Sequence, residues 1–244
     1  MKITIENLIE RSRKEASPEG RFTRRLSVYL TWIILRTPLS ANFVTLAFGI
    51  VGMLSVILFA NGERHTNIIG SILLILHVLL DYVDGDVARV RDTQSVFGAV
   101  FESILHDLTY PGLFLAIGWG FYHQNDGNEY ILIISMIAAI FWIISNNISV
   151  YYQLQIIKNE ISNPHETLGI SKDIDLSLDP RWGELQQWIK RVIFDRLYWV
   201  WLWIPLFAAL QILNIFVLIQ GLMLSSLCTV KLVKLYWQTK AKPK

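Results

Sequence analysis

The chain has 244 residues, of which 53% are hydrophobic and 17% are charged, and it carries a formal net charge of +2. Its mean hydropathy is +0.41, and its apolar residues gather in runs that approach the roughly 20 residues a helix needs to cross a bilayer, which excludes an ordinary soluble domain. Backbone N–H and C=O groups in lipid must find their hydrogen-bond partners within the protein, so these runs predict an all-α, polytopic membrane protein. We expect no nucleic-acid partner.

Residues 1–41 are polar and basic and form a separate N-terminal segment in our prediction. Within it, the apolar stretch of RRLSVYLTWIILR is short and is bracketed by arginines. This pattern is typical of an amphipathic helix that lies along the membrane surface rather than crossing it. We expect Arg21, Arg24 and Arg25 to face anionic lipid, with an acceptor phosphate as the alternative. No apolar core of a cleavable signal peptide is visible here.

A catalytic domain with six transmembrane helices is predicted over residues 42–236, followed by a basic tail, 237–244. The expected spans cover about 42–60, 66–84, 96–121, 129–152, 197–212 and 215–234, with a polar loop at about 157–190. Lysine and arginine gather in the N-terminal segment, in the RVRD turn, in this loop and in the tail. The positive-inside bias therefore predicts that both termini and the acidic stretch 81–107 lie at the cytoplasmic face.

The stretch 81–107, DYVDGDVARVRDTQSVFGAVFESILHD, carries the strongest functional signal in the chain. On a helix, residues three or four apart share a face, so Asp81 pairs with Asp84 and Glu102 pairs with His106; His77 extends the first pair. Acidic groups in membrane spans are costly, and a fold that accumulates them recovers that cost most simply by binding cations. We expect the second and third spans to pack side by side and form a metal site; salt-bridged interface residues are the alternative.

The spacing in this stretch resembles the signature of the CDP-alcohol phosphatidyltransferase family. In that signature, an Asp, two residues and Asp-Gly lead through two more residues to Ala-Arg; eight residues later comes a Gly, with acidic positions four and eight residues beyond it. The matching residues are Asp81, Asp84, Gly85, Ala88, Arg89 and Gly98. Upstream, PLSANFVT is similar to the family's Pro-Asn-x-x-Thr entry to the first span, with Ala41 in place of the proline. Six spans also fit the family.

The resemblance implies a metal-dependent phosphotransferase of phospholipid synthesis. An alcohol hydroxyl would attack the β-phosphate of a CDP-linked donor, which we expect to be CDP-diacylglycerol, and CMP would be released; a CDP-linked small alcohol with a lipid acceptor is the alternative. Two divalent cations, Mg²⁺ or Mn²⁺, would be held by Asp81, Asp84, Glu102 and His106. The nucleotide and phosphate pocket would be lined by Asn42, Thr45, Asp84, Gly85, Ala88, Arg89 and Gly98. A homodimer is expected.

Two positions depart from the family pattern, and both belong to residues that we assign to catalysis. Glu102 replaces an aspartate and can still ligate. His106 replaces the last aspartate, and it could act as the general base, because imidazole titrates near neutral pH. It could instead ligate a softer metal, or mark a relative that has lost activity. Asp107 is turned by about 100° around the helix and cannot simply take over.

Other polar residues give weaker signals. We place His77, Asp107, Asn146 and Asn147 around the site, although interhelical hydrogen bonding explains the two asparagines equally well. Gln153 stands where many family members have an arginine thought to bind an acceptor phosphate, which argues against a phosphorylated acceptor. An ion-coupled carrier and a catalytically silent relative are the rival functions, and CMP release separates the enzyme from both.

Overall fold

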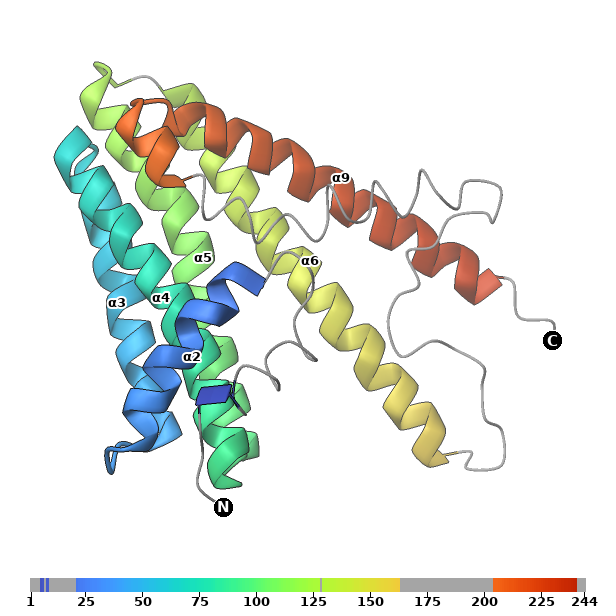
Figure 1. The fold of residues 1–244 in the computed structure, drawn as a ribbon. Coiled ribbons are helices and arrows are strands. Elements are labelled where there is room, and N and C mark those ends of the chain that lie inside the picture. The colour runs from blue at the N-terminus through green and yellow to red at the C-terminus, as the bar shows by residue number, and fades with distance from the viewer. Residues whose placement is uncertain (1–4, 7, 9–20, 128, 163–203, 241–244) are drawn as a thin grey trace.

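The computed structural model describes residues 5–6, 8, 21–127, 129–162 and 204–240 (Figure 1). The labelled helices are α2 (Arg21–Leu35), α3 (Ala41–Asn61), α4 (Arg64–Arg91), α5 (Val96–Gln124), α6 (Glu129–Ser162) and α9 (Leu213–Lys240). Residues 204–209 add a short helical segment before α9. The described part of the chain contains helices and no strand, which confirms the predicted all-α class.

The helices α3, α4 and α5 stand side by side as a bundle, while α6 and α9 lean away from it (Figure 1). α5 packs on α6, and α6 packs in turn on α9. The main core lies between these helices and is built from large side chains that are almost fully buried, among them Phe59, Leu74, Leu113, Phe114 and Phe216. This arrangement places the helices that carry the acidic stretch, α4 and α5, on either side of α3.

Short polar side chains define where the helices of the bundle begin. The Ser40 hydroxyl accepts a hydrogen bond from the backbone N–H of Phe43 at 3.2 Å and caps α3. The Ser95 hydroxyl accepts from the N–H of Gly98 at 3.0 Å and caps α5 in the same way. Such caps satisfy amide groups that have no partner within the helix, so the sequence marks these two helix starts locally.

The turn between α3 and α4 depends on Gly62, which has a φ of +78°. A Cβ atom added there would lie 2.4 Å from the carbonyl oxygen of Gly120 on α5. Residues other than glycine adopt this conformation rarely, and none could fit a side chain against the neighbouring backbone. Gly62 and Gly120 therefore allow the α3–α4 turn to approach α5 closely, as small residues do in membrane helix pairs.

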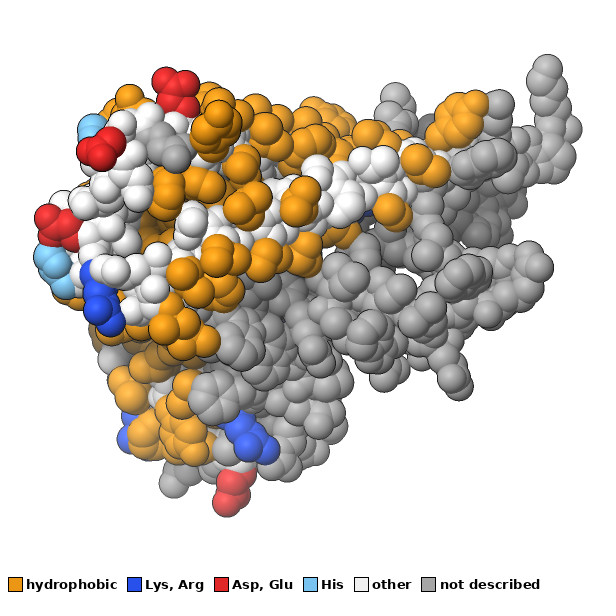
Figure 2. All heavy atoms as spheres, turned by 90° about the horizontal axis from the view of Figure 1, so that it is seen from above, with side chains coloured by type: hydrophobic (Ala, Val, Ile, Leu, Met, Phe, Trp, Pro, Cys, Tyr) orange, Lys and Arg blue, Asp and Glu red, His pale blue; other side chains and the backbone are white. Residues whose placement is uncertain are grey.

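Four helices among the described residues are long and apolar enough to cross a bilayer: α3, α4, Glu129–Ile148 of α6 and Leu213–Val233 of α9. Figure 2, which looks down on the end where α3 meets α4, shows mostly hydrophobic side chains with few charged ones. Many large apolar residues are exposed, such as Ile57 (63%) and Ile140 (53%), as expected for surfaces that face lipid. These features support an integral membrane protein.

The other two of the six predicted spans, the third and the fifth, are not among these four helices. α5 has 29 residues and covers the expected third span, but it is not among the four helices that satisfy both length and apolarity. The first part of the expected span at 197–212, residues 197–203, lies outside the described residues, and only the segment 204–209 of the remainder is helical. Residues 163–190 of the polar loop and the last residues of the tail, 241–244, also lie outside the described residues. Six spans therefore remain a prediction.

The N-terminal helix α2 packs against α4. It buries Ser27, Val28 and Thr31, while Tyr29 and Ile33 on its other faces are exposed. Arg91 at the end of α4 donates hydrogen bonds to the carbonyl oxygens of Ile34 (3.2 Å), Thr37 (2.7 Å) and Leu39. These carbonyls belong to the C-terminal end of α2 and the following link, where helical partners are missing. Arg91 thus fastens this end of α2 to α4.

Candidate metal and nucleotide site

The two aspartates of α4 lie three residues apart but engage different neighbouring helices. Asp81 faces α5, where its Oδ1 lies 3.0 Å from Nε2 of His106. Asp84 faces α3, where its Oδ2 accepts a hydrogen bond from the Thr45 hydroxyl at 2.7 Å. The two aspartates therefore contact two different helices of the bundle, α5 and α3, rather than converging on a single point.

Asp81, Glu102 and His106 form a three-residue cluster in which the potential ligand atoms all lie within 4.8 Å of one another. Glu102 and His106 are one turn apart on α5, with Oε1 and Nε2 separated by 3.9 Å. The side chains are 17%, 44% and 23% exposed, respectively. Two carboxylates and an imidazole nitrogen at this spacing are a suitable donor set for a divalent cation.

Asp84 lies outside this cluster and is the most deeply buried of the predicted ligands, at 4% exposed. Its Oδ1 atom is buried and has no hydrogen-bond partner among the described residues. Burying a charged oxygen without a hydrogen-bond partner costs roughly several kcal/mol of free energy, unless a further group is bound there. The orphaned oxygen and the cluster together fit the divalent cations that the resemblance implies.

The imidazole of His106 is held in a defined orientation by aromatic neighbours. It stacks on Tyr110, with ring centroids 5.3 Å apart and an interplanar angle of 3°, and it meets the edge of His77 at 5.9 Å. Nε2 faces the two carboxylates, while Nδ1 is buried and has no hydrogen-bond partner among the described residues. The nitrogen that is available for chemistry at the cluster is therefore Nε2.

His77 lies directly behind His106 and is completely buried. Its Nδ1 lies 2.9 Å from the carbonyl oxygen of Phe48 on α3, and because a carbonyl can only accept, Nδ1 must carry the proton. A Cβ atom added to Gly52 would come within 2.7 Å of this nitrogen. His77 thus fills a space that the glycine leaves open and supports the ring of His106 from the inside.

A cavity of about 180 Å³, which we call the site cavity, opens beside Asp84 between α3, α4 and α5. It is lined by Ala41, Asn42, Thr45, Asp84, Gly85, Ala88, Arg89, Thr93, Gln94, Ser95, Gly98, Ala99 and Glu102. The set includes all seven residues predicted for nucleotide and phosphate binding. The structure brings them together around one space; that they bind a nucleotide remains a prediction.

Two glycines of the site cavity have close polar neighbours. A Cβ atom on Gly85 would lie 3.3 Å from Nη1 of Arg89, and one on Gly98 would lie 3.3 Å from Oδ1 of Asn42. Both values are tighter than ordinary van der Waals contact. The absence of a side chain at these positions therefore makes room for a guanidinium and an amide at the cavity wall.

A larger cavity, of about 450 Å³, lies at the opposite end of the bundle. It is bordered by the α3–α4 turn, the start of α4, the end of α5 and the start of α9, and among the described residues Glu63 is its one acidic lining residue. It shares no residue with the three-residue cluster. By size alone, this larger cavity would be the candidate functional site. The smaller site cavity is the better candidate because two of the potential metal ligands, Asp84 and Glu102, line it.

Of the residues that the sequence places around the site, His77 lies beside the cluster, whereas Asp107, Asn146 and Asn147 make other contacts. Asp107 points toward α6, where its Oδ1 accepts from the Asn146 side chain at 2.8 Å. Asn147 is exposed and donates to the carbonyl of Ile143 on its own helix, so the structure does not bring it to the cluster. The side chain of Gln153 lies outside the described residues.

Three contacts near the site were not anticipated from the sequence. Tyr110 stacks on His106, which its position one turn further along α5 could have suggested. Asp86, which lies between two signature positions, accepts from both Arg89 and Arg24. Arg24 was expected to face lipid, but its guanidinium reaches Asp86 on α4 instead.

Comparison with known proteins adds the family. A sequence model of CDP-alcohol phosphatidyltransferases matches residues 38–227, which is well over half of the chain. No curated protein matches the chain in sequence. The matched region runs from the link before α3 into α9 and contains the site cavity, the three-residue cluster and Asp84. The chain therefore belongs to the CDP-alcohol phosphatidyltransferase family, whose members are phosphotransferases.

Proposed function

We propose that this protein is an integral-membrane, metal-dependent phosphotransferase that moves a phosphatidyl group from CDP-diacylglycerol to an alcohol and releases CMP. The observation that carries the proposal is that the site cavity is lined both by Glu102 of the three-residue cluster and by Asp84, whose Oδ1 has no hydrogen-bond partner among the described residues. Acidic donors beside a space lined by small residues suit a nucleotide pyrophosphate and its counter-ions.

The reaction requires one bond to form and one to break. The acceptor's hydroxyl oxygen bonds to the β-phosphorus of the donor, the bond from that phosphorus to the oxygen of CMP breaks, and the hydroxyl proton passes to a base. Divalent cations held by Asp81, Asp84, Glu102 and His106 would supply neutralisation of the pyrophosphate charge and of the charge on departing CMP. Arg89 would donate to a donor phosphate, as a guanidinium fork does.

His106 has two candidate roles in this scheme, and we propose that it is a metal ligand through Nε2. The distances of 3.0 Å to Asp81 and 3.9 Å to Glu102 support that role, because they place the nitrogen among the carboxylate donors. The other role is general base, and it uses the same nitrogen, since Nδ1 is buried. In the ligand role, Glu102, the most exposed member of the cluster, is the residue left to accept the hydroxyl proton.

We also propose six membrane spans with both termini and the site at the cytoplasmic face, and a homodimer. The charge distribution supports this orientation, because the turns expected at the opposite face contain Arg64 and no lysine. Single-cysteine accessibility at Asp92 and Asp126, in a background without Cys228, would test it in sealed vesicles. Labelling of both sites from the same side would contradict the orientation.

The test of function is CMP release by the purified full-length protein with Mg²⁺ or Mn²⁺. CDP-diacylglycerol and a panel of CDP-linked small alcohols would each be offered with candidate acceptors. We expect CMP from the wild type and from Asp92→Asn, an exposed acid at the end of α4, and none from Asp84→Ala. Nucleotide binding without CMP from any pair would instead identify a silent relative, and metal-coupled ion flux would identify a carrier.

A further inference from the structure

One carboxylate oxygen of Asp86 joins two arginines from different helices. Its Oδ1 accepts from Nη1 of Arg24 at 3.2 Å and from Nη2 of Arg89 at 2.5 Å. The side chains of Asp86 and Arg24 are 13% and 14% exposed. Ion pairs at the open surface contribute little because water screens them, whereas an enclosed one that forms part of a network holds its geometry.

The pairing sets the direction of Arg89, which lines the site cavity. The guanidinium folds back over Gly85 and occupies the space next to the position that a Cβ atom would take, at 3.3 Å from Nη1. A guanidinium is a planar fork of N–H groups, so it can keep a carboxylate on one edge and bind phosphate oxygens with another. Asp86 therefore orients Arg89 without belonging to the cavity wall itself.

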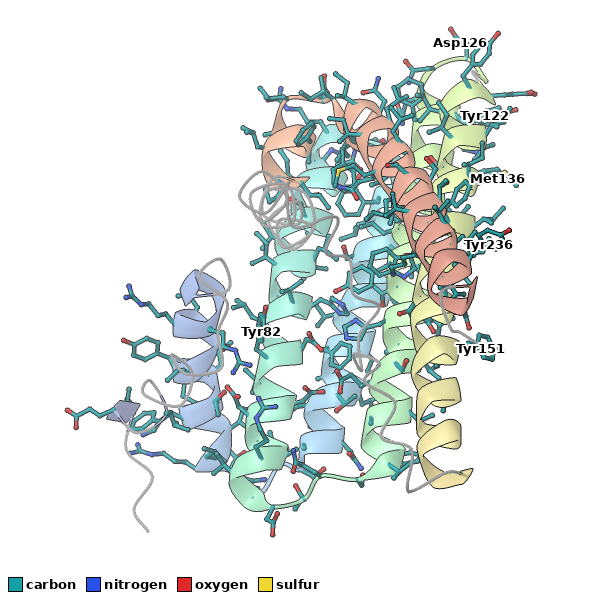
Figure 3. The ribbon with its side chains drawn as sticks, turned by 90° about the vertical axis from the view of Figure 1, so that its right-hand side faces the viewer. Tyr82, Tyr122, Asp126, Met136, Tyr151 and Tyr236 are labelled. Carbon is teal, nitrogen blue, oxygen red and sulfur yellow. The ribbon has the colours of Figure 1, made fainter. Side chains whose placement is uncertain are left out.

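The same oxygen connects this arginine to α2, which precedes residue 38, where the family match begins. The guanidinium of Arg24 also lies over the ring of Tyr82, 5.2 Å from its centroid. In Figure 3, Tyr82 of α4 lies between that helix and α2. Arg91 fastens the other end of α2 independently, so α2 stays docked when the Arg24 contact is removed.

We propose that Asp86 is a positioning residue for the arginine that binds the donor phosphate, and that α2 tunes donor affinity through Arg24. The inference rests on the proposed function. Without Asp86, Arg89 loses its fixed direction, and ordering a long side chain opposes donor binding. Without Arg24, Arg89 is the arginine that remains to neutralise Asp86. The carboxylate of Asp86 then binds the guanidinium of Arg89 more strongly and competes better with the donor phosphate for it. Both changes weaken donor binding, and both act through one carboxylate.

A double-mutant cycle tests this coupling. Wild type, Asp86→Asn, Arg24→Gln and the double variant would be compared in steady-state kinetics with the donor. We expect the donor KM to rise roughly fivefold for Asp86→Asn and roughly twofold for Arg24→Gln, with kcat nearly unchanged. The double variant should equal Asp86→Asn alone. Arg25→Gln removes an exposed charge from the same helix and is the matched control, with no change in KM.

Equilibrium binding of CDP, measured by calorimetry with Mg²⁺ or Mn²⁺, repeats the cycle without turnover. It keeps the two proposals apart: the same pattern in CDP binding, with no CMP formed by the wild type, would sink the proposed function and leave the positioning role supported. Asp86→Glu retains the charge and should bind CDP between wild type and Asp86→Asn, which guards against a misfolded variant. Unchanged or tighter CDP binding by Asp86→Asn, or additive effects in the cycle, would overturn the inference.

Discussion

Thr45→Val is the sharpest perturbation of the candidate site, because it removes one hydroxyl and nearly conserves volume. The Thr45 side chain is 4% exposed and donates to Oδ2 of Asp84 at 2.7 Å, while Oδ1 has no hydrogen-bond partner among the described residues. The substitution takes away the Thr45 hydroxyl that steadies this buried carboxylate. A hydrogen bond to a charged group contributes about 1.5–3 kcal/mol, and groups that orient metal ligands typically change metal affinity by about 10–100-fold.

We therefore expect Thr45→Val to raise the Mn²⁺ dissociation constant by about 10–100-fold, measured as free Mn²⁺ by electron paramagnetic resonance. Thr45→Ser keeps the hydroxyl and should bind close to the wild-type level. Ser55→Ala removes another buried hydroxyl of α3, which donates to Gly70 at 2.7 Å, and should lower thermal stability without weakening Mn²⁺ binding. Equal Mn²⁺ binding by Thr45→Val and wild type would refute the role assigned to this hydrogen bond.

Three further outcomes are expected. His106→Asp should retain metal-dependent CMP release, whereas His106→Ala should lose most of it and Asp107→Asn little, because the Asp107 side chain points toward α6; equal losses at both positions would contradict this. Gly52→Ala should lower both activity and the melting temperature, since its Cβ would press on His77 at 2.7 Å; a melting temperature at the wild-type value would count against that packing. Chelation should lower the melting temperature of the wild type and Mn²⁺ should restore it, with a smaller shift in Asp84→Ala; identical shifts in both would exclude Asp84 as a ligand.

The parts of the site that follow from helix periodicity could be predicted from the sequence. Glu102 and His106 are one turn apart on a single helix, so their proximity is a local property. Their meeting with Asp81 was expected from side-by-side packing of the second and third spans, which a short connection favours. In the structure α4 and α5 each pack on α3 rather than extensively on each other, and the side chains of Asp81 and His106 make the contact, at 3.0 Å. The Ser40 and Ser95 caps are likewise local signals.

Contacts that depend on which helix faces which could not be predicted in this way. Asp84 was expected to point with Asp81, but Thr45 on α3 provides its partner. Arg24 and Asp86 are 62 residues apart in the chain, and no periodicity links them. Both contacts are set by how α2 and α3 pack around α4, and that packing depends on side-chain shape rather than on spacing.

The hydrogen bonds from Arg91 to three carbonyl groups help to define which residues form one structural unit. A fragment starting where the family match begins, at residue 38, would lack Ile34 and Thr37, two of the three groups that Arg91 binds, and also Arg24. Arg91 would then keep the carbonyl of Leu39 and Asp86 would keep Arg89, and lipid headgroups or water would replace the partners that α2 and the following link provide. The family match therefore begins inside a packed structural unit and not at its edge. α2 precedes the match but packs as part of the domain that follows it.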